Sequence, residues 1–182
     1  MNNFFLVLVC VFVSFDILAQ VVRQKDSHEH GAAKLMMAME GKKLQVEFEV
    51  PSESLIGFEH LPKSQSNRKN FNEAIKNLSD PSKLFSMPNK AECLLVGMNV
   101  SQSLFSNEEE HGHDESEKSE IHSEFKSNYY WNCQHLDEID SIGTELMSFF
   151  PRIEEIRVNW ISNYGQGSLE LESKDDRIKG WK

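Results

Sequence analysis

The sequence lacks the motifs of common enzymes and the charge of a nucleic-acid-binding protein. It contains no His-Glu-x-x-His, no Gly-x-Ser-x-Gly and no phosphate-binding glycine loop, so we predict that it is not an enzyme. Acidic residues outnumber basic ones, 29 to 19, which gives a formal net charge of −10. We expect no nucleic-acid partner, because binding one requires a basic surface. No repeat of about 20 to 50 residues is present, which excludes a solenoid.

Long apolar runs are also scarce, and the longest lies at residues 4–13. It is too short for a helix across a bilayer, which takes about 20 residues, but it has the length of a signal-peptide core. We predict a signal peptide at residues 1–19, cleaved after Ala19, and one mature domain at residues 20–182 that is not embedded in the membrane. An N-terminal anchor that is never cleaved is the alternative. A signal peptide predicts export, and we expect the mature chain in the periplasm.

Cysteine is rare, with three in the chain, and Cys10 lies inside the apolar run. The predicted mature chain therefore keeps Cys93 and Cys133. In an exported protein, an even number of cysteines indicates a disulfide.

The spacing of the two cysteines supports this pairing. Cys93 lies 13 residues before Ser106, and Cys133 lies 13 residues after Glu120. A hairpin centred on His113 would place the cysteines opposite each other, with Cα atoms about 4.5–5.5 Å apart. The same register sets apolar residues of the first strand against polar residues of the second. A β-bulge, or a sheet covered on both faces, would resolve that conflict.

Alternating apolar and polar residues predict an antiparallel sheet of about six strands, mostly joined as hairpins. The expected strands lie at residues 33–39, 44–50, 91–105, 121–133, 156–160 and around 169–171. One apolar stripe predicts a helix that starts near Ser66 or Asn67 and stops before Pro81. A second short helix is expected at residues 144–149. The predicted fold class is therefore α+β, an antiparallel β-sheet with about two short helices.

Histidine is the most informative residue type, because it occurs twice as His-x-His. The pairs are His28 with His30 and His111 with His113. In an extended chain, residues two apart point to the same side, about 6.6 Å apart. Two such imidazoles can close on one metal ion, with zinc–nitrogen distances of about 2.0–2.1 Å. Each pair is therefore a candidate metal-binding motif.

The second pair lies in a strongly acidic segment at residues 106–124. Residues 106–120 include no apolar side chain, so we predict a mobile loop. A divalent cation would offset its negative charge, with His111, His113, His122 and Asp114 as candidate ligands. The alternative is a solvated acidic loop, in a non-metal interaction protein that docks a basic partner.

Zinc is the favoured metal, because imidazole is a poor ligand for calcium. Cu²⁺ and Ni²⁺ are also compatible with histidine and carboxylate ligands. His60 and His135 occur singly, and single histidines at such positions are more often surface residues than ligands.

Several short motifs together resemble one known family, the zinc-regulated periplasmic zinc-binding proteins of the ZrgA type. The matching stretches are His28-Glu29-His30-Gly31, Gly57-Phe58-Glu59-His60 with Pro62, Ala91-Glu92-Cys93, Tyr130-x-x-Cys133, Phe149-Phe150-Pro151 and Gly165-Gln166. They follow the family order over nearly all of the predicted mature chain. The resemblance implies a periplasmic zinc-binding protein of Gram-negative bacteria that is induced when zinc is scarce.

The resemblance also implies partners and a further ligand. Such proteins are thought to assist a high-affinity zinc ABC transporter, in some cases beside its substrate-binding protein. The family pairs the first His-x-His motif with the segment that ends in His60, so His28, His30 and His60 form a predicted site. Family members carry a long run of alternating His and acidic residues between the central strands. This chain keeps only His111, His113 and His122 there, so one weak site is expected in the loop.

Overall fold

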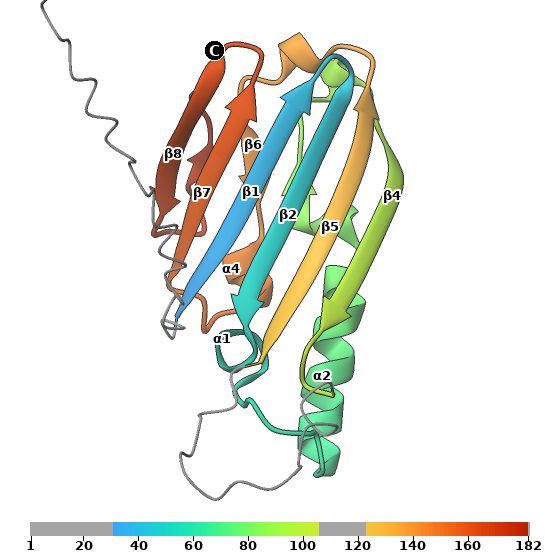
Figure 1. Cartoon of the computed structure of the whole chain (residues 1–182), viewed down its shortest axis with the longest axis vertical. Helices are drawn as coiled ribbons and strands as arrows, with labels where there is room; N and C mark the ends of the chain where they lie inside the picture. The colour runs from blue at the N-terminus through green and yellow to red at the C-terminus, as the bar shows by residue number, and fades with distance from the viewer. Residues whose placement is uncertain (1–30, 106–122, 182) are drawn as a thin grey trace, which may run out of the picture.

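A computed structural model describes residues 31–105 and 123–181, and its main feature is a six-stranded sheet (Figure 1). The strands lie in the order β4-β5-β2-β1-β7-β8. They are β1 (Ala32–Glu40), β2 (Lys43–Pro51), β4 (Cys93–Gln102), β5 (Glu124–Cys133), β7 (Glu155–Ser162) and β8 (Gly165–Leu171). Each corresponds to one of the six predicted strands, and the predicted α+β class is confirmed.

The hairpin of β1 and β2 forms where the alternation predicts it. Leu35 pairs with Phe48, and Glu40 pairs with Lys43. The two-residue turn contains Gly41, whose φ of 59° lies in the left-handed region. Turns of two residues need this backbone conformation, which glycine adopts without strain.

One strand pair differs from the predicted antiparallel sheet. β1 and β7 run parallel, from Ala32 opposite Glu155 to Ala38 opposite Ile161, so the sheet is mixed and the prediction is wrong for this pair. The other four neighbouring pairs are antiparallel. Parallel neighbours need a long crossover connection. Residues 134–154 return the chain from the end of β5 to the end of the sheet where β1 begins.

A second, smaller sheet was not predicted, because its strands are too short to show alternation. Its strands, β3 (Phe85–Ser86), β6 (Ile142–Thr144) and β9 (Arg177–Ile178), lie in the order β3-β6-β9. The C-terminal segment is also bound to the residues just before β6, because Trp181 Nε1 donates to Ile139 O at 2.8 Å.

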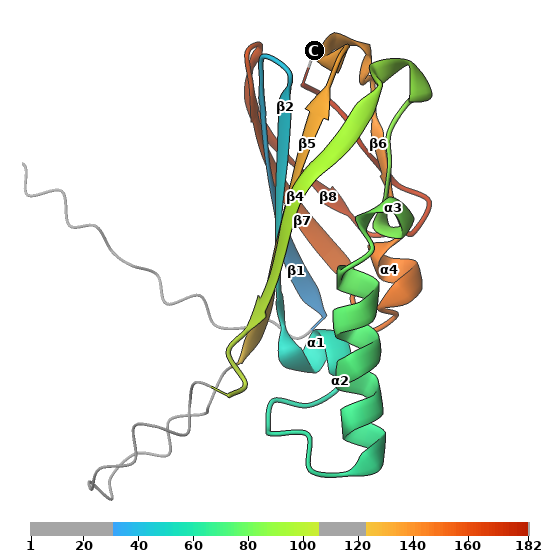
Figure 2. The same ribbon diagram turned by 90° about the vertical axis from the view of Figure 1, so that its right-hand side faces the viewer.

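The helices α2, α3 and α4 lie to one side of the main sheet (Figure 2). The helical segments are α1 (Ser52–Ile56), α2 (Gln65–Leu78), α3 (Pro81–Leu84) and α4 (Leu146–Phe149), with 3₁₀ turns at Asn89–Ala91 and Leu136–Glu138. Both predicted helices are present, and α1 and α3 are additional. The longer helix starts before the predicted caps, because Ser64 Oγ accepts from Asn67 N at 3.0 Å.

The core lies between the main sheet and these helices. Alternate residues of the central strands are fully buried on this side, among them Leu35, Phe48 and Phe125. Tyr129 is also buried, and its hydroxyl donates to Leu78 O at 2.8 Å. Burial raises the pKa of Tyr129 to about 12, because the charged phenolate would be desolvated.

Candidate metal centre

At one end of the main sheet, hereafter the α1 end, lie residues that are next in the sequence to predicted histidine ligands. There β2 passes into α1, while β1 and β5 begin (Figure 1). Gly31 N donates to Ser54 Oγ at 2.9 Å, and Ser52 N donates to Ser123 O at 2.8 Å. Ser52, Ser54 and Ser123 are buried. Residues 31 and 123 are therefore held against the same short helix.

These two positions lie close together across the sheet. Gly31 immediately precedes β1 and Ser123 immediately precedes β5, and β2 lies between those strands. Neighbouring strands are about 4.8 Å apart, so the two positions are separated by about 10 Å. In the sequence, Gly31 follows His30 and Ser123 follows His122. The serines that make these hydrogen bonds were not predicted, because a single serine carries no sequence signal.

A left-handed turn leads the chain from α1 towards His60. Gly57 has a φ of 86°, and its N–H donates to Glu53 O at 2.8 Å. A Cβ atom at this position would lie 2.9 Å from Arg152 Nη2. Both the backbone conformation and the close guanidinium group therefore favour glycine here.

His60 is exposed, and its neighbours orient its ring. The Nδ1 atom lies 2.9 Å from Leu61 O. A carbonyl oxygen can only accept, so in the neutral ring Nδ1 carries the hydrogen and Nε2 keeps its lone pair. The ring stacks on Phe58 with centroids 5.0 Å apart, and Ser123 Oγ donates to Glu59 O at 3.5 Å. Metal-binding histidines commonly donate their second N–H to a carbonyl, so this geometry suits a ligand.

The Cys93–Cys133 disulfide is present, and the two cysteines are directly paired in the ladder of β4 and β5. A β-bulge between Leu95 and Gly97 shifts the register. Beyond it, Met98 lies opposite Tyr129 on the core-facing side. The bulge, one of the two predicted solutions, therefore resolves the register conflict for Met98 and Val100, while Leu94, which precedes it, still lies opposite Asn132.

The disulfide lies at the opposite end of the sheet from α1. Strand β5 starts at the α1 end with Glu124 and ends with Cys133. Nine steps of about 3.4 Å separate these residues by about 30 Å. The bond therefore closes the far end of the hairpin and does not contact the candidate metal centre.

The other predicted ligands, His28, His30, His111, His113, Asp114 and His122, lie outside the described residues. Of the predicted loop at 106–124, the structure describes Ser123 and Glu124, which belong to the fold. Within residues 31–105 and 123–181, no three His, Cys, Asp or Glu side chains are grouped to hold a metal ion. The complete ligand set therefore stays a prediction.

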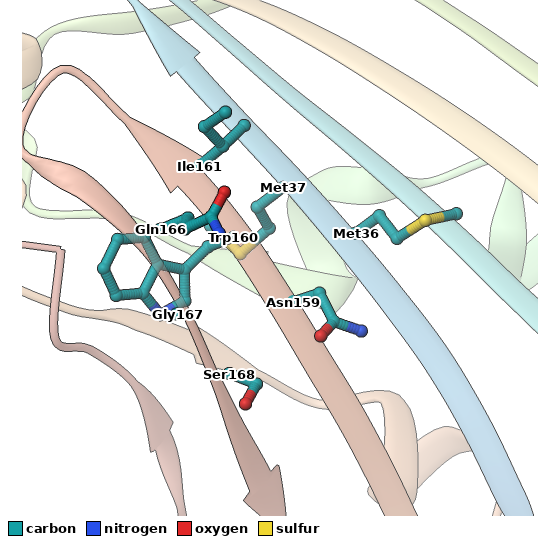
Figure 3. A pocket seen from close by; sticks show the side chains of 8 residues that line it. All are labelled: Met36, Met37, Asn159, Trp160, Ile161, Gln166, Gly167 and Ser168. Atoms are coloured by element: carbon teal, nitrogen blue, oxygen red, sulfur yellow. The ribbon is translucent and has the colours of Figure 1, made fainter. Parts of the chain in front are cut away.

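A shallow hollow on β1, β7 and β8 offers no alternative metal site (Figure 3). Its lining residues are Met36, Met37, Asn159, Trp160, Ile161, Gln166, Gly167 and Ser168. None is a histidine, cysteine or carboxylate, so the lining lacks the usual zinc ligands. The Trp160 indole lies against Gly167, where a Cβ atom would be 2.5 Å from Trp160 Cζ2.

In the described part of the chain, no helix is long and apolar enough to span a bilayer. The fold defines the chain as an α+β protein, built mostly of β-strands. The chain belongs to the ZrgA family: the model for "ZrgA family zinc uptake protein" matches residues 27–180. This match confirms the resemblance seen in the sequence, and it includes all seven predicted metal ligands. No curated protein matches the chain.

Proposed function

We propose that this protein captures Zn²⁺ in the periplasm, after removal of residues 1–19, and hands it to a tighter-binding acceptor during zinc uptake. The observation that supports the proposal is the arrangement of the α1 end. Gly31 and Ser123, the chain neighbours of two histidine-bearing segments, are hydrogen-bonded to one helix beside His60. Histidines from three separate parts of the sequence thereby become candidates for the same region.

The first proposed ligand group is His28, His30 and His60. Covalent geometry keeps the Cα atoms of adjacent residues 30 and 31 about 3.8 Å apart. Gly31 is bonded to Ser54 of α1, and α1 leads through one turn to His60. A zinc ion bound by His60 Nε2 would therefore lie near the attachment of the first His-x-His motif.

The second proposed group is His111, His113 and His122, with Asp114 as a carboxylate ligand. His122 directly precedes Ser123, which accepts the Ser52 hydrogen bond. Eight acidic residues between Ser106 and Phe125 would raise the local concentration of divalent cations. Cu²⁺ and Ni²⁺ would compete with Zn²⁺, since both accept imidazole ligands.

Hand-over follows from modest affinity at an exposed site. Ligands that must be ordered on binding give up part of their interaction energy, so the bound ion exchanges more readily. The proposed acceptor is a high-affinity zinc ABC transporter or its substrate-binding protein. The membership of a zinc uptake family supports this role more than the alternative, a loop that docks a basic protein.

A competitive zinc titration tests the first ligand group. We expect His60→Ala and the double variant His28→Ala/His30→Ala each to weaken zinc binding by about tenfold or more, because each removes a ligand. His135→Ala is the matched control, since His135 is exposed and follows Cys133 at the far end of the sheet. Equal affinities in all four proteins would reject the α1-end site.

A separate titration tests the loop. His111→Ala/His113→Ala should lower the zinc stoichiometry or affinity, while the free energy of unfolding changes by less than about 0.5 kcal/mol. Unchanged zinc binding would reject this group. A chain that binds no zinc but still binds a basic protein through the loop would replace zinc capture with the docking alternative.

A further inference from the structure

The segment between α4 and β7 also passes the α1 end, where it contacts Gly31. This segment follows the Phe149-Phe150-Pro151 motif. Glu154 N and Glu155 N both donate to Gly31 O, at 2.8 Å and 3.1 Å. The backbone that enters β7 is therefore fixed to the residue that directly follows His30 in the sequence.

Two core side chains anchor this segment. Phe150 and Ile153 are each 3% exposed, and Ile153 N donates to Phe150 O at 3.0 Å. Glu154, the next residue, is exposed. A turn held by buried apolar residues therefore fixes the backbone from which the Glu154 carboxylate extends.

The Glu154 side chain lies beside Gly31. A Cβ atom at Gly31 would be 3.5 Å from both Cδ and Oε2 of Glu154. Gly31 has a φ of 85°, which glycine adopts without strain. On the same segment, the guanidinium group of Arg152 lies against Gly57, in the turn that leads to His60. The segment therefore contacts both the residue after the first His-x-His motif and the turn before His60.

A zinc ion held by His30 is within reach of the Glu154 carboxylate. A Cα–Cβ bond is about 1.5 Å long and adjacent Cα atoms are about 3.8 Å apart, so Glu154 Oε2 lies within about 9 Å of the Cα atom of His30. An imidazole side chain together with two metal–ligand bonds of about 2.0–2.2 Å spans such a distance. Both side chains can therefore bind one ion while the backbone stays in place.

The chemistry of zinc also favours a carboxylate here. Imidazole ligands are neutral and leave both charges of the ion uncompensated, whereas histidines combined with one carboxylate form a common zinc ligand set. Glu29 does not suit this role, because in an extended chain it points away from the two histidines that flank it. Glu155 does not suit it either, since its carboxylate is paired with the Arg157 guanidinium.

We propose that Glu154 is the carboxylate ligand of the α1-end zinc site and completes the group of His28, His30 and His60. The inference rests on the proposed function, and it adds to that site a ligand from a separate part of the sequence. It also gives the Phe149-Phe150-Pro151 motif a role, which is to hold the backbone that carries Glu154. A carboxylate ligand favours Zn²⁺ over Cu⁺, because Cu⁺ prefers soft sulfur ligands.

A competitive zinc titration of the protein without residues 1–19 tests the inference. The variants are made in a His111→Ala/His113→Ala background, so that the loop contributes no histidine pair. Glu154→Gln keeps the size of the side chain and removes its charge, and it should raise the zinc dissociation constant by about tenfold or more. Glu155→Gln is the matched control, since it removes the same charge from the adjacent residue, and it should change the dissociation constant by less than about threefold.

The visible spectrum of bound Co²⁺ distinguishes a ligand from a nearby charge. Co²⁺ replaces Zn²⁺ in the titration, and its absorption depends on the type and geometry of its ligands. Glu154→Gln should change this spectrum, while Glu155→Gln should leave it as in the background protein. Far-ultraviolet circular dichroism confirms that each variant is folded.

A combined variant shows whether the carboxylate and the histidines bind the same ion. In His28→Ala/His30→Ala protein, the addition of Glu154→Gln should weaken zinc binding by less than about threefold, because the shared site is already lost. Equal affinities and spectra for Glu154→Gln and Glu155→Gln would overturn the inference, as would an undiminished effect of Glu154→Gln in the combined variant. In both cases the histidine site would stand. Zinc binding that is unaffected by His28→Ala/His30→Ala would instead reject the α1-end site itself, and Glu154 as its ligand with it.

Discussion

Removal of the Cys93–Cys133 disulfide should lower the free energy of unfolding by up to about 4 kcal/mol. The two cysteines are 40 residues apart in the sequence. On the chain-entropy model, closing a loop of this length reduces the entropy of the unfolded chain by about 13 cal/mol/K, or about 4 kcal/mol at 25 °C. That is a large part of the 5–15 kcal/mol that stabilises a typical domain.

The fold itself should survive the loss of this bond. Strand β5 is paired with β2 along its whole length as well as with β4, so its position does not depend on the disulfide. The double variant Cys93→Ala/Cys133→Ala also removes a buried sulfur at position 133. A small additional loss of stability is expected there, because the deleted atom leaves a cavity.

Urea unfolding followed by circular dichroism, with and without a reductant, measures the effect. The reductant should destabilise the unaltered protein and have no effect on the double variant, which is the control. Zinc affinity should change by less than about threefold, because the disulfide and the α1 end are about 30 Å apart. A stability loss below about 1 kcal/mol would refute the entropy argument. A large loss of zinc affinity would refute the separation of the two ends.

Three further predictions concern single positions and pH. Stability should fall as pH rises from about 10 to about 12, because the pKa of Tyr129 is raised in the folded state; urea titrations should show that Tyr129→Phe removes this loss of about 2–3 kcal/mol. Gly57→Ala should cost about 1–2 kcal/mol in urea unfolding and weaken zinc binding, because φ is 86° and the turn positions His60. Zinc affinity, measured by competition with a chelator, should fall below about pH 6, because protonated imidazole cannot coordinate a metal.

Much of the candidate site depended on information that the sequence does not display. His60 looked like a single surface histidine, and only the family resemblance connected it with His28 and His30. The structure adds the hydrogen bond from His60 Nδ1 to Leu61 O, which leaves the lone pair of Nε2 for the proposed zinc ion. It also adds the shared attachment to α1, since nothing in the sequence relates Ser52 to Ser123.

The sequence by itself determined the six long strands, the longer helix and the disulfide. Alternation and helical periodicity are local patterns, and they record which face of each element is buried. The cysteine pairing could also be predicted, because two strands joined directly as a hairpin have a register set by their spacing from the turn. Even the bulge near Val96 had a local cause, since perfect register set apolar residues against polar ones.

Only the tertiary structure decided which strands are neighbours when they are far apart in the sequence. The parallel pairing of β1 with β7 depends on the crossover at residues 134–154. The short helix α4 within it was predicted, but no local pattern specifies beside which strand the chain re-enters the sheet. The long-range pairing of β2 with β5, together with the β1–β2 hairpin, sets the beginnings of β1 and β5 on either side of β2, and so brings Gly31, Ser123 and α1 together. Local patterns specify which face of a strand is buried but not which neighbour covers its edge, so this end of the sheet could not be foreseen from the sequence.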